Sequence, residues 1–158
     1  MRKICPLIVL IFGLLMSLQI PAAVEVEKTV RVFRTLEEAA GRPERPLLLV
    51  FFSLECHVCW DELFEMRYFL EKNSIPVDLV GISADREEDL RPFLAKYGFF
   101  RPVVADREKA LFRKFKVRQE PFQVVLDRDA VVLLDDTSQE FYARRDKVKQ
   151  CLLEIASR

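Results

Sequence analysis

Two cysteines separated by two residues, Cys56 and Cys59, form the pattern with the clearest chemistry in this 158-residue sequence. They follow an apolar run at residues 47–52, which predicts a strand covered on both faces. The apolar positions after them have helical spacing, so Cys56 falls at the start of a helix. There, unpaired N–H groups and the helix dipole stabilise a thiolate. We therefore predict that Cys56 is an exposed nucleophile that attacks a disulfide, and that Cys59, one turn deeper, resolves the mixed disulfide.

The first 23 residues have the pattern of a secretory signal peptide. Two basic residues precede an apolar run at residues 7–20, and the small residues Ala22 and Ala23 follow it. The run is shorter than the roughly 20 apolar residues that a membrane-spanning helix needs. Cleavage is therefore favoured, with a retained membrane anchor as the alternative. We expect a signal peptide at 1–23 and one domain at 24–158, in the periplasm or otherwise outside the cytoplasm.

Charge and cysteine content narrow the classes of function. The chain has 25 basic and 25 acidic residues, and removal of the two basic residues in segment 1–23 leaves 23 against 25. This balance gives no support to nucleic-acid binding. Without Cys5, three cysteines remain, and three cannot all pair within one chain. Cys151 lies on an apolar helix face and is expected to be an inert core thiol.

Two other interpretations of the cysteine pair are weaker but stay open. A structural disulfide with this spacing closes a very small loop and constrains the unfolded chain little. A metal site usually needs a second pair of ligands, whereas residues 24–158 offer only His57 and the distant Cys151 besides the pair. We therefore expect no bound metal and no other cofactor.

Strand and helix patterns alternate around the pair. Residues 24–45 are a mixed, charged lead-in to the core. Asp85 and Glu88 resemble a capping box at the start of a helix that Gly98 would end. A turn at 127–130 predicts an antiparallel hairpin. The strand patterns are 47–52, 77–82, 102–104, 122–126 and 131–134. With helices between them and at the C-terminus, they predict an α/β fold, a three-layer α/β/α sandwich around a central mixed β-sheet.

From Pro46 to Leu134 the chain resembles the periplasmic TlpA/ResA-type thioredoxins, which belong to the redoxin and thioredoxin-like group. One match is the Cys56-x-x-Cys59-x-x-Glu62 motif. The other matching stretches are 47–53, 80–83, 103–106, 115–121 and 124–129. The resemblance implies the thioredoxin fold and dithiol–disulfide exchange with protein cysteines.

The resemblance also implies roles for particular residues near the cysteines. Pro121 matches the family's cis-proline, whose loop faces the CxxC motif, so Glu120 and Pro121 are expected to contact substrate. The alternative for Pro121 is an ordinary proline at the start of a strand. Glu62 matches an acidic residue that tunes or relays protons to the thiols, with a solvated glutamate as the alternative. His57 would stabilise the Cys56 thiolate.

Several residues depart from the family pattern and leave the partner and the reduction potential open. Glu55 stands where relatives often have Trp, and Trp60 instead follows the motif. Trp60 is expected to pack between helices, with substrate docking as the alternative. The acidic residues Glu55, Glu62 and Glu120 would raise the thiol pKa and oppose the effect of His57, so the net direction stays open.

We therefore expect an extracytoplasmic thiol–disulfide oxidoreductase that acts as a monomer on cysteine-containing proteins. Reduction is favoured over oxidation by analogy with the family, which implies a membrane redox partner that supplies electrons. Two alternatives stay open. One is a non-catalytic binding or assembly module with the same fold. The other, weaker alternative is a redoxin-type peroxidase, since Leu54-Glu55-Cys56 lacks the threonine–cysteine context expected for it.

Overall fold

Short apolar runs build the centre of the molecule. Every residue of β2 (Leu47–Phe51) is buried, and so is nearly all of β3 (Asp78–Ser83). These two strands pair in parallel, as the unbroken apolar runs predict for strands covered on both faces. The computed structural model describes residues 29–41, 44–129, 131–135 and 141–157. The predicted signal peptide at 1–23 lies outside the described residues.

The described strands form one mixed six-stranded sheet in the order β1-β4-β3-β2-β5-β6. On one side of β2 and β3, β4 (Val103–Ala105) and β1 (Val32–Phe33) continue the parallel pairing. On the other side, β5 (Phe122–Leu126) pairs antiparallel with β2, and β6 (Val132–Asp135) pairs antiparallel with β5. The predicted hairpin and the predicted mixed sheet are therefore confirmed.

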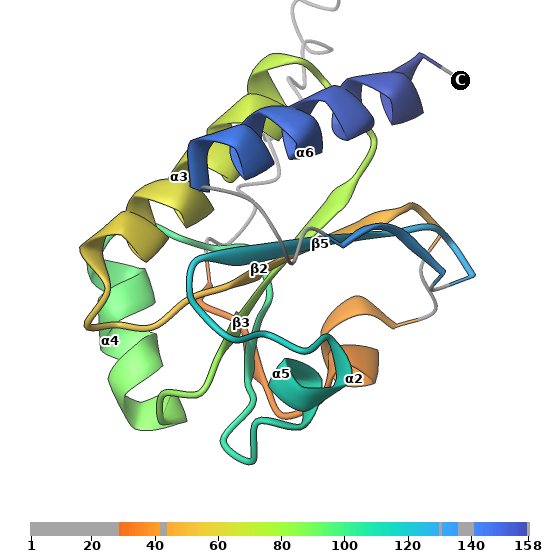
Figure 1. Ribbon diagram of the computed structural model, residues 1–158. Helices are drawn as coiled ribbons and strands as arrows, with labels where there is room; N and C mark the ends of the chain where they lie inside the picture. The colour runs from red at the N-terminus through yellow and green to blue at the C-terminus, as the bar shows by residue number, and fades with distance from the viewer. Residues whose placement is uncertain (1–28, 42–43, 130, 136–140, 158) are drawn as a thin grey trace, which may run out of the picture.

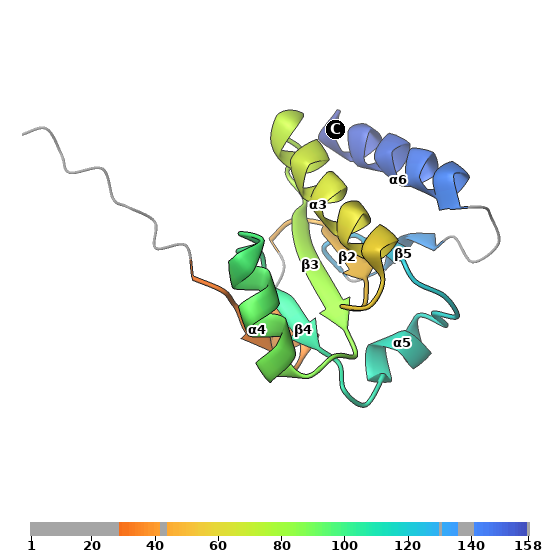
Figure 2. The same cartoon turned by 90° about the vertical axis from the view of Figure 1, so that its left-hand side faces the viewer.

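Helices cover both faces of the sheet (Figure 1). On one face, α3 (His57–Lys72), α4 (Glu87–Lys96) and α6 (Phe141–Ala156) contribute residues to one buried apolar cluster. On the other face, a second cluster packs beneath α2 (Leu36–Ala40) and α5 (Ala110–Lys114). Figure 2 shows α3 and α6 side by side on their face of the sheet. The three-layer α/β/α sandwich is therefore confirmed.

Two local predictions need correction. The lead-in at 24–45 contains two elements that the sequence pattern did not reveal, the edge strand β1 and the short helix α2, whose N-cap Thr35 accepts a hydrogen bond from the Glu38 N–H. The capping box at Asp85 is wrong, because Arg86 is the N-cap of α4 and makes no side-chain capping bond. Asp85 instead bonds to the loop before the cysteines. Within the described part of the chain, no helix has the length and apolar character needed to cross a bilayer.

Candidate active site

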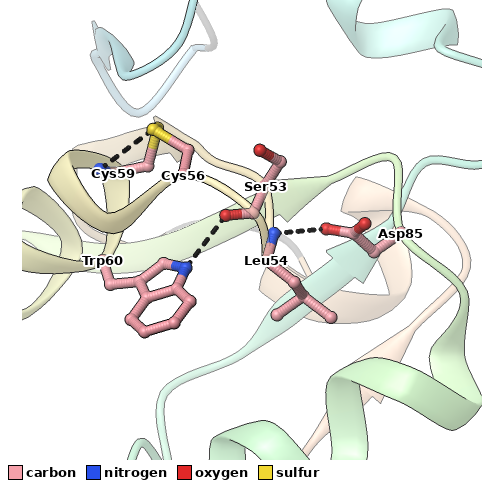
Figure 3. The surroundings of a disulfide bond; sticks show 6 residues. All are labelled: Ser53, Leu54, Cys56, Cys59, Trp60 and Asp85. Carbon is pink, nitrogen blue, oxygen red and sulfur yellow. Dashed lines mark hydrogen bonds between the residues drawn. A yellow bond between two sulfur atoms is a disulfide. The ribbon is translucent and has the colours of Figure 1, made fainter.

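Cys56 lies at the N-cap of α3, directly after the loop that follows β2. Its Sγ is bonded to Sγ of Cys59 at 2.09 Å and also accepts a hydrogen bond from the Cys59 N–H at 3.2 Å (Figure 3). The N-cap position directs the first-turn N–H groups of α3 toward this sulfur, where they would stabilise a thiolate in the reduced protein. The predicted placement of the CxxC motif at a helix start is therefore confirmed.

The two sulfurs differ in exposure. Cys59 is fully buried and packs in the apolar cluster beneath α3, whereas Cys56 is partly exposed. Its neighbours His57 and Val58 are also exposed. Because an incoming disulfide can reach only an exposed sulfur, Cys56 is the sulfur suited to attack it. The buried Cys59 is suited to resolve the mixed disulfide that this attack forms.

The loop before Cys56 is held by Asp85, from the segment after β3. Oδ2 of Asp85 accepts a hydrogen bond from the Leu54 N–H at 2.8 Å (Figure 3). The same oxygen accepts a hydrogen bond from Oγ of Ser83 at 2.7 Å. Ser83 is itself fully buried. These bonds fix the approach of the chain to α3. The sequence analysis missed this role because Asp85 lies 31 residues from Leu54.

Trp60 joins the motif to α4. Its Nε1 donates a hydrogen bond to the Ser53 carbonyl at 3.0 Å (Figure 3). The Trp60 ring lies 4.6 Å from the Phe93 ring and 5.7 Å from the Tyr97 ring, measured between centroids. The centroid of the His57 ring lies 4.5 Å from that of the Trp60 ring. These contacts support the expected packing role of Trp60.

Pro121 lies beside the cysteine loop, and the Glu120–Pro121 peptide bond is cis, as the family resemblance implied. The sheet register explains the position, because Phe122, the next residue, pairs with Phe51 at the end of β2. Ser53, two residues after Phe51, is hydrogen-bonded to the Glu120 side chain. The predicted neighbours Cys56 and Pro121 therefore lie at the same edge of the sheet.

The Glu120 carboxyl is half-buried beside this loop. Burial raises the pKa of Glu120 above its ordinary value. The hydrogen bond from Ser53 opposes this rise, repulsion from Asp85 adds to it, and attraction to Lys109 opposes it.

Glu62 lies on the same face of α3 as Cys59, one turn further on, and is fully buried. The alternative of a solvated glutamate is therefore wrong. Its Oε2 accepts a hydrogen bond from Nε of Arg145 at 2.7 Å, and the two side chains also form an ion pair. Its Oε1 accepts a hydrogen bond from Nε2 of Gln123. The sequence analysis missed both partners, which lie 61 and 83 residues away.

Cys151 packs at the border of the apolar cluster beneath α6 and is half-buried. Among the described residues, no group of three or more His, Cys, Asp or Glu side chains is arranged to hold a metal ion.

The comparisons with known proteins agree with this geometry. Residues 22–138 match the model of the AhpC/TSA family, so the chain belongs to that family. The redoxin resemblance is therefore confirmed. The chain is 26% identical over 100 residues to the thiol-disulfide oxidoreductase YkuV from Bacillus subtilis (strain 168). That alignment covers 60% of this chain and 66% of YkuV, slightly less than two thirds of the relative.

Solved structures share the fold at low sequence identity. The thioredoxin domain of a thiol-disulfide oxidoreductase from Bacteroides vulgatus superposes with a TM-score of 0.55 at 16% identity, over 74% of this chain and 84% of that one. Peroxiredoxin Q from Xanthomonas campestris superposes with a TM-score of 0.63 at 24% identity, over 77% of this chain and 84% of that one. Both likenesses establish the thioredoxin-like fold.

Proposed function

We propose that this protein is a thiol–disulfide oxidoreductase that exchanges disulfides with cysteine-containing proteins and acts mainly as a reductant. The observation that carries the proposal is the Cys56–Cys59 disulfide at the start of α3, with one sulfur exposed and the other buried. The cis-proline loop beside it and the similarity to a curated thiol-disulfide oxidoreductase support the same activity.

The proposed reaction transfers two electrons to the substrate. In the reduced protein, the Cys56 thiolate attacks one sulfur of a substrate disulfide, and the other substrate sulfur leaves as a thiolate that takes up a proton. The Cys59 thiol then loses its proton and attacks Sγ of Cys56. This step forms the Cys56–Cys59 disulfide and releases the second substrate thiol. The substrate disulfide is thereby reduced to two thiols, and the protein is oxidised.

Glu62 is suited to assist the second step. It lies one turn from Cys59 on the same buried face of α3, where a carboxylate can accept the proton that Cys59 must lose. Arg145 holds that carboxylate in place. His57 is exposed next to Cys56, where a protonated imidazole would favour the attacking thiolate. Glu120 and Pro121 would line the substrate contact.

The cellular setting belongs to the same proposal. The pattern at 1–23 supports export, and we infer that the protein acts outside the cytoplasm, with the signal segment cleaved or kept as an anchor. A reductant there needs electrons, so a membrane redox partner would re-reduce the Cys56–Cys59 disulfide. The protein would act as a monomer.

Single cysteine substitutions test the activity. Cys56→Ser should abolish reduction of a protein disulfide such as that of insulin, because the attacking sulfur is removed. Cys59→Ser should instead accumulate mixed disulfides with substrate, seen as a mass increase that dithiothreitol reverses. Cys151→Ser is the matched control and should keep wild-type exchange. Unchanged exchange in the Cys56 variant would exclude this mechanism. A pair that does not cycle reversibly in a glutathione redox titration would favour the binding module.

A further inference from the structure

A hollow of about 410 Å³ lies beside the cis-proline loop, and apart from Glu120 its lining residues have no role in the reaction described above. It is formed by α5, by the segment that follows α5, and by Glu120 at the end of that segment. Phe112 is largely buried and Val117 half-buried, and they contribute its apolar surface. Because Glu120 lines the hollow and directly precedes Pro121, a chain bound at Pro121 can continue into it.

The hollow is strongly basic. Four of its lining residues carry positive charge, and one, Glu120, is acidic. The four basic side chains are Lys109, Arg113, Lys116 and Arg118, and all belong to exposed residues. None of the four forms an ion pair with an acidic side chain in the described part of the chain. The chain as a whole is neutral, so this concentration of charge is local.

The single acid leaves the hollow with an excess of positive charge, because four cationic side chains stand against one carboxyl. Unpaired cations on a concave surface attract oppositely charged partners and speed their association. Exposed, flexible lysine and arginine side chains around an apolar base suit a peptide that carries several acidic side chains.

We propose that this basic hollow is a substrate-recognition site for an acidic segment flanking the target cysteine of the substrate protein. This inference rests on the proposed function and adds a preference among its substrates. The acidic segment would lie across α5 while the adjacent cysteine meets Cys56. Recognition by charge would raise the rate of association more than the rate of the chemical step. Because salt screens charges, this gain in association rate should become smaller as the salt concentration rises.

Two synthetic peptides with the same internal disulfide test the preference. One carries four glutamates on one side of the disulfide, and the other carries four glutamines. At about 20 mM ionic strength, where screening is weak, the reduced protein should reduce the acidic peptide about tenfold faster in kcat/KM. At about 200 mM the advantage should shrink to about twofold, because the Debye length falls below about 10 Å and the charges are screened.

A charge-matched pair of variants locates the effect. Arg113→Gln with Lys116→Gln removes two positive charges from the hollow and should remove most of the acidic-peptide advantage. Arg128→Gln with Lys147→Gln removes two exposed charges elsewhere, in the turn between β5 and β6 and on α6, and should keep the advantage. Both variants should reduce the glutamine peptide at the wild-type rate.

The outcomes separate this inference from the proposed function. Equal reduction of both peptides by the wild-type protein, or an advantage that survives in the hollow variant, would overturn the recognition site and leave the oxidoreductase intact. Failure to reduce either peptide, or insulin, would overturn the proposed function itself. If inorganic phosphate binds the hollow while the acidic peptide gains no advantage, the hollow is a small-anion site and the inference is wrong.

Discussion

At the residue scale, the buried Glu62 connects three elements of the molecule. Its carboxylate on α3 bonds to Gln123 on β5 and to Arg145 on α6. A buried carboxylate without a partner is very costly, so this arrangement holds α6 against α3 next to the cysteines. Arg145 keeps 22% of its side-chain surface exposed, whereas Glu62 has none. Substitution of Arg145 and substitution of Glu62 should therefore lower the stability of the protein by different amounts.

Removing Arg145 should cost more stability than removing the charge of Glu62. Arg145→Met leaves a fully buried carboxylate without its cationic partner and should lower the free energy of unfolding by about 3 kcal/mol. Glu62→Gln leaves a guanidinium that reaches water and should cost only about 1 kcal/mol. Urea unfolding of both variants and of the double variant measures the difference. Equal losses in the two single variants would contradict this assignment of the burial cost.

The raised pKa of Glu120 predicts a pH-dependent stability. Its pKa in the folded protein lies above the ordinary value of 4.5, which applies to the unfolded chain. In the pH window between the unfolded and the folded pKa, the folded state therefore holds more protons than the unfolded state. Stability from this group is therefore full below pH 4.5 and falls as pH rises through the window. Glu120→Gln cannot ionise, so its stability relative to wild type should increase as pH rises through that window.

Urea unfolding of wild type and Glu120→Gln at several pH values measures this trend. Glu55→Gln is a suitable control, because Glu55 is an exposed neighbour of the same site. A constant stability difference for Glu120→Gln across pH 4 to 7, in steps of about one unit, would show that burial does not perturb this carboxyl.

At the element scale, α3 and α4 are joined by the contacts of Trp60 rather than by apolar residues alone. The Trp60 ring packs on Phe93 and Tyr97 of the α4 segment, while its N–H bonds to the loop before Cys56. The packing and docking interpretations of this residue predict opposite results. Packing implies a loss of stability on substitution, whereas docking implies a loss of activity alone.

Trp60→Ala should therefore lower the free energy of unfolding by about 3 kcal/mol, as truncation of a packed aromatic does. Trp60→Phe keeps an aromatic ring but loses the hydrogen bond to Ser53, and should cost about 1 kcal/mol. Thermal and urea unfolding measure both values. Trp60→Phe should also reduce insulin at close to the wild-type rate. A variant with full stability but a large loss of exchange with protein substrates would instead identify Trp60 as a docking residue.

Elements with a strong local signal could be predicted from the sequence, and elements defined by distant contacts could not. The apolar run 47–52 and the helical spacing after Cys56 predicted β2 and α3 because burial and periodicity act within a few residues. β1 has only two residues and exists through pairing with β4, some 70 residues later, so its own sequence carries little signal. The contacts of Glu62 with Gln123 and Arg145 could not be predicted for the same reason, because these partners lie 61 and 83 residues away in the sequence.

At the scale of the whole molecule, the sheet separates two apolar clusters, and the site lies above the cluster that α3 covers. Gly81 lies in the central strand β3 and is closely packed against its neighbours. A Cβ at Gly81 would lie 3.0 Å from Cε1 of Phe52, 3.2 Å from Cγ2 of Val103 and 3.6 Å from Cδ1 of Leu63. The absence of a side chain at Gly81 therefore lets Phe52, Val103 of β4 and Leu63 of α3 pack closely against β3.

Gly81→Ala should lower the free energy of unfolding by about 2 kcal/mol, because overpacking of a well-filled core displaces its neighbours. The closest neighbour belongs to Phe52, so Phe52→Leu should relieve part of the clash. The cost of Gly81→Ala should then be smaller in the Phe52→Leu background than in wild type, and a double-mutant cycle by urea unfolding measures the coupling. Strictly additive costs would mean that the backbone of β3, rather than Phe52, absorbs the added methyl group. Since Phe52 directly follows β2 in the segment that leads to Cys56, coupling would also connect core packing to the position of the attacking sulfur.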